Sequence, residues 1–186
     1  MNTQQRILEI DDVVKHFDIS GGLLDRLTFE GGKPALKKET VKAVNNVSLA
    51  INTGETLSVV GESGCGKSTL ARVVMGLHSP NSGRVLYNGS RIDNLSHHKM
   101  LPYRKKMQMI FQDPYASLNP RKTVRQTLEE PLRFHNPKMS NAEIMDKIKE
   151  VMEQVGVDPG WIRRFPHEFS GGQRQRISIA RGLILD

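Results

Sequence analysis

The sequence lacks several features, and each absence excludes a class of protein. It has one cysteine, Cys65, so no internal disulfide framework can form. No apolar run approaches the roughly 18 residues that a membrane-spanning helix needs. The polar start, residues 1–6, leads into the chain without the apolar stretch of a secretory signal. These absences predict a cytoplasmic protein whose membrane role, if any, depends on a partner.

The composition is that of a soluble globular chain. Its 186 residues are 37% hydrophobic and 25% charged, which is enough for one ordinary domain or a fragment of a longer protein. The net charge of +7 favours an acidic ligand: a nucleotide, a nucleic acid or an anionic membrane surface. The basic residues are spread along the chain, so a solvated basic surface is favoured over a dedicated nucleic-acid patch.

Apolar runs and alternation predict several β-strands in the first part of the chain. They lie near residues 7–14, 47–51, 56–60, 84–87 and 106–111. The segment 56–60 ends at Gly61 and is typical of a central strand that leads into a glycine-rich loop. Asn88-Gly89 marks a tight turn. Residues 18–42 show no clear period and carry the pairs Gly21-Gly22 and Gly31-Gly32, which predicts an inserted loop.

Helical patterns dominate the second part of the chain. A first helix is expected earlier, over residues 68–77, and helices take over from about residue 114. Ser140 and Glu143 form a capping box, and an apolar stripe follows at helical spacing. Its members are expected to be core residues: Ile144, Ile148, Val151, Met152 and Val155. A last helix is predicted from Ser170 through Ile184. The mixture indicates an α/β protein.

A phosphate-binding loop is the strongest functional signal. Two glycines separated by four residues, then lysine and a hydroxyl residue, stand between a predicted strand and a predicted helix. Glycine allows the backbone N–H groups to wrap a phosphate chain, and Lys67 supplies a charge for the β- and γ-phosphates. The Ser68 hydroxyl suits Mg²⁺, while Cys65 is interpreted as a small filler. The predicted nucleotide ligands are Gly61, Glu62, Ser63, Gly64, Cys65, Gly66, Lys67, Ser68 and Thr69.

A second anion site is predicted at residues 170–173. Serine at a helix start, followed by two glycines, lets backbone N–H groups approach a phosphate. The run Phe169-Ser170-Gly171-Gly172-Gln173 resembles the signature of the ABC-type ATPases, usually Leu-Ser-Gly-Gly-Gln, with Phe169 in place of leucine. In that family the signature contacts the nucleotide held by the opposite subunit.

Further motifs strengthen the resemblance. Phe111-Gln112-Asp113-Pro114 resembles the Q-loop, whose glutamine touches Mg²⁺ and the attacking water. Phe17 resembles the aromatic residue that stacks on adenine, with a place in the core as the alternative. Residues 112–121 and 165–169 are similar to the oligopeptide, dipeptide and nickel importer subgroup.

The resemblance implies a fold and a role. It implies a P-loop NTPase core over about 1–113 and 169–186, with an N-terminal antiparallel β part and a helical subdomain inserted at about 114–168. It implies ATP and Mg²⁺ as cofactors, with Lys67 and Gln112 catalytic and Ser68 and Gln112 at the metal. The partners implied are a second ATP-binding subunit, membrane permease subunits and, indirectly, a solute-binding protein. The protein would energise solute import, of a peptide in this subgroup, at the cytoplasmic face of the membrane.

One part of the family pattern is missing. Hydrolytic members have, after the signature helix, an apolar strand ending in Asp-Glu and then a switch histidine. Residues 183–186 mimic the first element but are expected to continue the last helix, and Glu129-Glu130 precede the signature. We therefore expect a C-terminally incomplete ATPase with at most residual activity on its own, because the missing groups hold Mg²⁺ and polarise water.

Two alternatives remain at this stage. One is a non-transport ABC-type ATPase that acts on nucleic acid or ribosomes, although no nucleic-acid partner is expected. The other is a non-catalytic nucleotide-binding remnant. The histidines, including His97-His98, lack metal-ligand spacing and are expected at the surface.

Overall fold

The computed structural model describes residues 5–20, 27–30, 33–36, 39–113 and 117–185. In the two short strands at 27–30 and 33–36 the description is limited to the backbone. The chain divides into two compact units, Met1–Met100 and Leu101–Asp186, and each is described by itself. No helix in the described ranges combines the length and apolar character needed to span a membrane.

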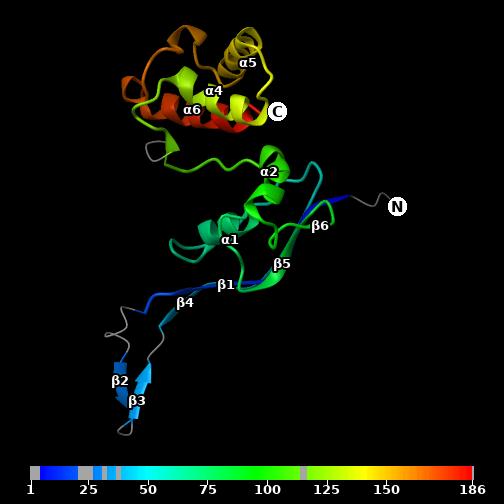
Figure 1. Ribbon diagram of the computed structural model, residues 1–186, viewed down its shortest axis with the longest axis vertical. Helices are drawn as coiled ribbons and strands as arrows, with labels where there is room; N and C mark the ends of the chain where they lie inside the picture. The colour runs from blue at the N-terminus through cyan, green and yellow to red at the C-terminus, as the bar shows by residue number, and fades with distance from the viewer. Residues whose placement is uncertain (1–4, 21–26, 31–32, 37–38, 114–116, 186) are drawn as a thin grey trace. The chain divides into compact units, whose positions relative to one another are not determined.

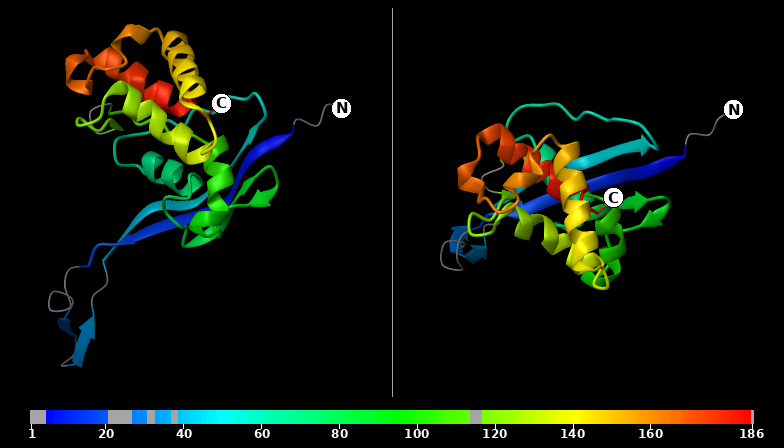
Figure 2. Two further views of the ribbon diagram at one scale, coloured as in Figure 1. Left: turned by 45° about the horizontal axis from the view of Figure 1, so that its top comes forward. Right: turned by 90° about the horizontal axis from the view of Figure 1, so that it is seen from above.

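An antiparallel sheet organises the first unit (Figures 1 and 2). Its strands are β1 (Arg6–Asp18), β4 (Thr40–Asn52), β5 (Ser82–Tyr87) and β6 (Ser90–Arg91), in the order β4-β1-β5-β6. In β1, Ile10 lies opposite Leu49 of β4 and Val85 of β5, which places the centre of the sheet at a buried position. The predictions of strands near residues 7–14, 47–51 and 84–87 are confirmed.

The turn between β5 and β6 is the predicted one. Asn88 has φ 47° and Gly89 has φ 74°. Positive φ at both central residues is the geometry of the two-residue hairpin turn that Asn-Gly favours. The local sequence was sufficient here because the turn depends on two residues only.

The region expected as an inserted loop contains a hairpin. Strand β2 (Leu27–Glu30) pairs with β3 (Lys33–Leu36), with Glu30 opposite Lys33. A Gly-Gly pair between two short strand-like runs is a sequence signal for a hairpin, so the sequence could have predicted this element. Gly21, Gly22, Gly31 and Gly32 themselves lie outside the described residues.

Two predicted strands are wrong. Residues 56–60 and 107–111 form neither strand nor helix, and Val60 and Ile110 keep 89% and 45% of their surface exposed. A strand requires hydrogen bonds to a neighbouring strand, and neither segment is paired with one in the described part of the chain. Apolar, β-branched sequence alone therefore did not determine a strand.

Two helices border these segments. Helix α1 (Lys67–Val74) ends three residues earlier than predicted, and Gly76 follows with φ 63°. Helix α2 (His97–Lys106) was not predicted and takes in Lys106, the first residue of the wrong strand. Its sequence is mostly polar, contains Pro102 and buries Met100, so it carries no apolar stripe that would have shown it.

Three helices pack on one another in the described part of the second unit. They are α4 (Val124–His135), α5 (Asn141–Gln154) and α6 (Gly171–Leu183), with short 3-10 turns η1 (Pro159–Trp161) and η2 (Pro166–Glu168) between the last two. Figure 1 shows α4, α5 and α6 lying side by side, and all three pairs are in contact. Their shared core contains Leu128, Ile144, Ile148, Val151, Met152, Phe169, Ile177 and Ile184.

The helix boundaries follow from their caps. The Ser140 hydroxyl accepts from Glu143 N while the Glu143 carboxylate accepts from Ser140 N, which confirms the predicted capping box. Helix α6 continues through Leu183 into a helical Ile184, so residues 183–185 are no strand, as expected. Asp186 lies outside the described residues.

Candidate functional site

The predicted phosphate loop leads directly into α1. Gly64 has φ 83° and Gly66 has φ 101°, the left-handed region that glycine adopts without penalty. A Cβ built on Gly66 would lie 2.0 Å from the Ala43 carbonyl oxygen, and one on Gly61 would lie 2.8 Å from Cys65 Sγ. Glycine at position 66 is therefore required by both the backbone angle and the available space, whereas Gly64 is favoured by its backbone angle alone.

The start of α1 presents unpaired donors. No side chain caps it, no acidic residue lies in its first turn, and Leu70 N donates to Gly66 O. By helix geometry the N–H groups of Lys67, Ser68 and Thr69 have no intrahelical acceptor. These groups and the helix dipole create a partial positive charge beside the exposed Ser68 hydroxyl.

The Lys67 side chain folds back across the loop. Its Nζ donates to Gly61 O at 2.7 Å and to Glu62 O at 2.6 Å, and lies 3.6 Å from Cys65 Sγ. Among the described residues, no carboxylate forms an ion pair with it. The ammonium charge is held by neutral carbonyls and remains available to an anion.

A cavity of about 400 Å³ borders this loop within the first unit. Its walls are largely apolar and come from β4, the segment 56–60 and α1. The lining residues are Lys42, Ala43, Val44, Asn45, Val47, Leu49, Val59, Val60, Cys65, Gly66, Lys67 and Leu70. The phosphate loop thus has the N–H groups at the start of α1 on one side and a largely apolar cavity on the other.

Phe17 lies near the end of β1 and is half-buried. Its ring makes an edge contact with His78, at a centroid distance of 5.4 Å, and Lys15 Nζ lies 5.1 Å from the ring centroid. His78 follows α1 closely in the chain. Phe17 therefore contacts the segment just after α1, the helix that follows the phosphate loop. One face of its ring is covered by Lys15.

The predicted second anion site caps α6. The Ser170 hydroxyl accepts from Gln173 N at 3.3 Å, and the Gln173 side chain accepts from Ser170 N at 3.0 Å. Phe169 is buried and its ring contacts Trp161 edge-on, which confirms its role as an apolar anchor. A Cβ on Gly171 or Gly172 would meet nothing within 4 Å. Neither the backbone angle nor the packing of the chain requires glycine at these two positions.

Gln112 and Asp113 are exposed and belong to the second unit, as the Ser170 motif does. Pro114, which completes the predicted Q-loop, lies outside the described residues, as do Tyr115 and Ala116 of the run 112–121. The phosphate loop and Phe17 belong to the first unit. Within the described ranges, no three His, Cys, Asp or Glu side chains gather as a metal site. His97 and His98 are exposed, as expected.

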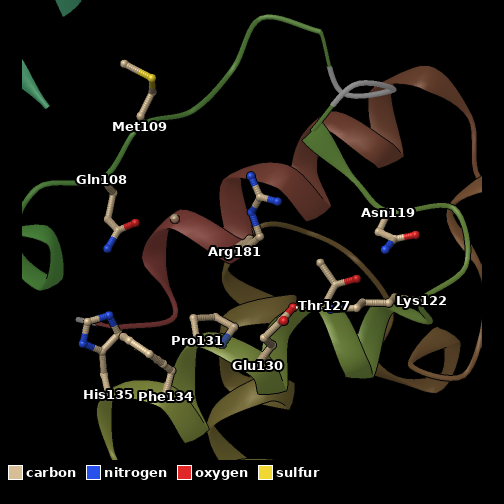
Figure 3. Close-up of a pocket in the computed structure, with 11 residues that line it drawn as sticks. Gln108, Met109, Asn119, Lys122, Thr127, Glu130, Pro131, Phe134, His135 and Arg181 are labelled. Carbon is tan, nitrogen blue, oxygen red and sulfur yellow. Dashed lines mark hydrogen bonds and ion pairs between the residues drawn. The ribbon is translucent and has the colours of Figure 1, made fainter. Parts of the chain in front are cut away.

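Sequence reasoning missed a pocket in the second unit (Figure 3). The cavity, of about 430 Å³, contains the half-buried Arg181 of α6, and Glu130 and His135 of α4. Burial lowers the pKa of the Arg181 guanidinium, opposed by the charge of Glu130. Burial and the charge of Lys105 lower the pKa of His135. The only sequence signal was an arginine placed beside the apolar stripe of the predicted last helix.

Similarity to known proteins agrees with these motifs. A family model described as ABC transporter matches residues 44–186. The chain is 48% identical over 184 residues to the oligopeptide transport ATP-binding protein AppF of Bacillus subtilis (strain 168), covering 98% of this chain and 53% of AppF. It is 47% identical over 180 residues to the oligopeptide transport ATP-binding protein OppF of Salmonella typhimurium, covering 97% of this chain and 52% of OppF. The chain thus spans about half the length of these curated relatives.

A solved structure is similar over nearly the whole chain. It is a dimeric, post-hydrolysis state of the ATP-binding cassette MJ0796 bound to ADP and Pi, with a TM-score of 0.77 and 27% sequence identity. The similarity covers 95% of this chain and 69% of that one. It confirms the predicted α/β fold class, with an antiparallel N-terminal part and a helical part.

Proposed function

The chain belongs to the ABC transporter family, and from that premise we propose that it is the ATP-binding part of a subunit that drives peptide import through ATP binding and hydrolysis. AppF and OppF are named oligopeptide transport ATP-binding proteins, which supports a peptide as the solute. Their names also favour transport over an ATPase that acts on nucleic acid or ribosomes. The observation that carries the proposal is the geometry around Lys67.

The loop residues would bind the phosphates of ATP. Free N–H groups at the start of α1 would donate to phosphate oxygens, and the Lys67 ammonium would exchange its bonds to Gly61 O and Glu62 O for bonds to the β- and γ-phosphates. The phosphate oxygens carry negative charge that the two carbonyls lack, so the ammonium gains Coulomb attraction in the exchange. Phe17 would stack on adenine through the ring face that Lys15 leaves open.

Mg²⁺ would be held without a protein cage. Mg²⁺ keeps several waters and uses few protein ligands beside the nucleotide phosphates, which fits an exposed Ser68 hydroxyl and an exposed Gln112 amide oxygen. When bound, the ion neutralises charge that develops on the phosphates. Gln112 would orient the attacking water, and Lys67 and Gln112 are the proposed catalytic residues.

The Ser170 motif would bind the nucleotide of a second subunit. Gly171 and Gly172 expose the first N–H groups of α6 in open space, although glycine costs a helix about 1 kcal/mol relative to alanine. A close approach by a phosphate from another copy or a paralogue explains that cost. The dimeric state named for the MJ0796 cassette supports this arrangement.

The remaining partners follow from the transport role. Permease subunits would bind this subunit at the cytoplasmic face of the membrane, where it is peripheral, and a solute-binding protein would act indirectly. We also keep the division into a core at about 1–113 and 169–186 and a helical subdomain at about 114–168 as part of the proposal.

Lys67→Ala tests the proposal. The affinity for a fluorescent ATP analogue with Mg²⁺ should fall about 10- to 100-fold, the value of a charge-assisted hydrogen bond. Lys99→Ala, an exposed lysine of α2, is the matched control and should leave the affinity unchanged. ATP should also slow alkylation of Cys65, the only cysteine. Equal affinity of the Lys67→Ala and unsubstituted chains would refute the proposed site.

A further inference from the structure

Residues on both sides of Gln112 contact one face of α6. We call the described residues 107–113 and 117 the Gln112 segment. On the N-terminal side, a Cβ on Gly182 would lie 3.3 Å from Ile110 Cγ1 and 3.9 Å from Gln108 Cβ. On the C-terminal side, Ser178 Oγ and Ser117 Oγ are 3.0 Å apart, and Arg181 Nη1 donates to Ser117 O. Residues 178, 181 and 182 are spaced by three and four, so they share a helix face.

Arg181 makes the strongest of these contacts. Figure 3 shows its side chain rising from α6 into the pocket, toward the segment that follows Met109. Arg181 is half-buried and Ser178 is 2% exposed, so this bond is partly shielded from water. A charge-assisted hydrogen bond gains strength under those conditions, and its loss would leave the Ser117 carbonyl without this donor.

The other end of α6 carries the Ser170 motif. The helix runs without interruption from Gly171 to Leu183 and begins at the Ser170–Gln173 capping box. Its continuous backbone hydrogen bonds make it a rod about 20 Å long. A group anchored near Arg181 is therefore mechanically connected to the Ser170 motif.

We propose that Arg181 is a positioning residue that anchors the Gln112 segment to α6, so that Gln112 and the Ser170 motif move as one body. The roles of the two motifs rest on the proposed function, but the anchor is a property of the second unit alone. In ATP binding, the anchor would make the response of Gln112 to its own nucleotide inseparable from the placement of Ser170 on a neighbour's nucleotide.

Arg176 provides a matched control on the same helix. Its Nη1 donates to the Gly156 carbonyl at 3.1 Å, at the end of α5, and not to the Gln112 segment. Arg176→Gln and Arg181→Gln each remove one bond from a guanidinium of α6 to a backbone carbonyl. Only Arg181→Gln should release the Gln112 segment.

The test measures a distance within the second unit. Spin labels are placed at Phe111→Cys and Gln175→Cys in a Cys65→Ser background, and the distance distribution is recorded by pulsed electron resonance without nucleotide. The unsubstituted Arg181 chain should give one population. Arg181→Gln should raise a detached population about tenfold, which a lost charge-assisted bond predicts. Arg181→Lys, which can still donate, should restore the single population.

The outcomes separate this proposal from the proposed function. An unchanged distribution in Arg181→Gln would overturn the anchor, and so would equal broadening in Arg176→Gln. ATP affinity at the Lys67 loop is measured in unlabelled Arg181→Gln and Arg176→Gln chains that keep Cys65. It should stay within about twofold, because neither substitution changes a contact of that loop. If the unsubstituted chain binds no ATP, the proposed function fails, while the distance measurement still decides on the anchor.

Discussion

The helical second unit and the segment 56–60 of the first unit use similar residues with opposite results. Val124 and Val151 are 0% and 1% exposed among α4, α5 and α6, whereas Val59 and Val60 are 50% and 89% exposed. A helix satisfies its own backbone hydrogen bonds and needs only a surface to pack against. A strand needs a hydrogen-bonded neighbour as well. The difference shows that an apolar segment is buried only where its backbone hydrogen bonds are satisfied and a surface is available to pack against.

The largest expected effect comes from truncating one side chain in each region. Ile148→Ala should lower the free energy of unfolding by about 2 to 5 kcal/mol, because Ile148 is fully buried and leaves a cavity. Val60→Ala should change it by no more than about 0.5 kcal/mol. Urea unfolding followed by circular dichroism measures both. Similar losses in the two variants would mean that Val60 is packed in solution and that the comparison fails.

Glycine-to-alanine substitutions at the two predicted anion sites should change stability in different ways. Gly66→Ala should destabilise the chain by about 2 to 4 kcal/mol, because it adds a left-handed residue and a contact of the new Cβ with the Ala43 carbonyl. Gly171→Ala should instead be neutral or stabilising by up to about 1 kcal/mol, since its Cβ enters open space on a helix. Thermal and urea unfolding of the two variants decide. A loss of stability in Gly171→Ala would show that the motif is constrained by the fold.

The smallest expected effect is on the pH dependence of stability, through the half-buried His135 of the helical unit. Burial and the charge of Lys105 lower the pKa of His135 from its ordinary value of 6.5, so the unfolded chain binds a proton more readily. Stability from this group is therefore present above about pH 6.5 and is lost as the pH falls through the lower folded pKa. The melting temperature should drop less between pH 7.5 and 5 in His135→Asn than in the parent. His98→Asn, at an exposed site, is the control and should behave as the parent.

Local chemistry explains which parts of the fold were predictable. The Ser140–Glu143 box, the Asn88-Gly89 turn and the start of α6 at Ser170 each depend on residues within four positions of one another. The strand at 84–87 was predictable as well, since it leads into that turn. Helix α2 was missed because its residues show no apolar period, and the β2–β3 hairpin because its Gly-Gly signal was read as a loop.

The residues of the candidate site also divide into those that the sequence could predict and those that it could not. The glycines of the phosphate loop and the lysine after them are recognisable because phosphate binding requires those residue types at that spacing. Arg181 was not recognisable as an anchor, since its acceptor is the carbonyl of Ser117, far away in sequence. No pattern of residue types specifies which backbone carbonyl a distant arginine will reach.

By itself, the sequence determined the family motifs, the caps and turns, and the helices whose apolar stripes repeat every three to four residues. All of these depend on neighbours along the chain. Only the tertiary structure decided that the segments 56–60 and 107–111 are not strands in the described part of the chain. It alone decided that Lys67 is held by the carbonyls of Gly61 and Glu62, and that Arg181 meets the Gln112 segment. Strand pairing, burial and side-chain partners depend on surfaces brought together by folding, and their energies are not encoded in any local window.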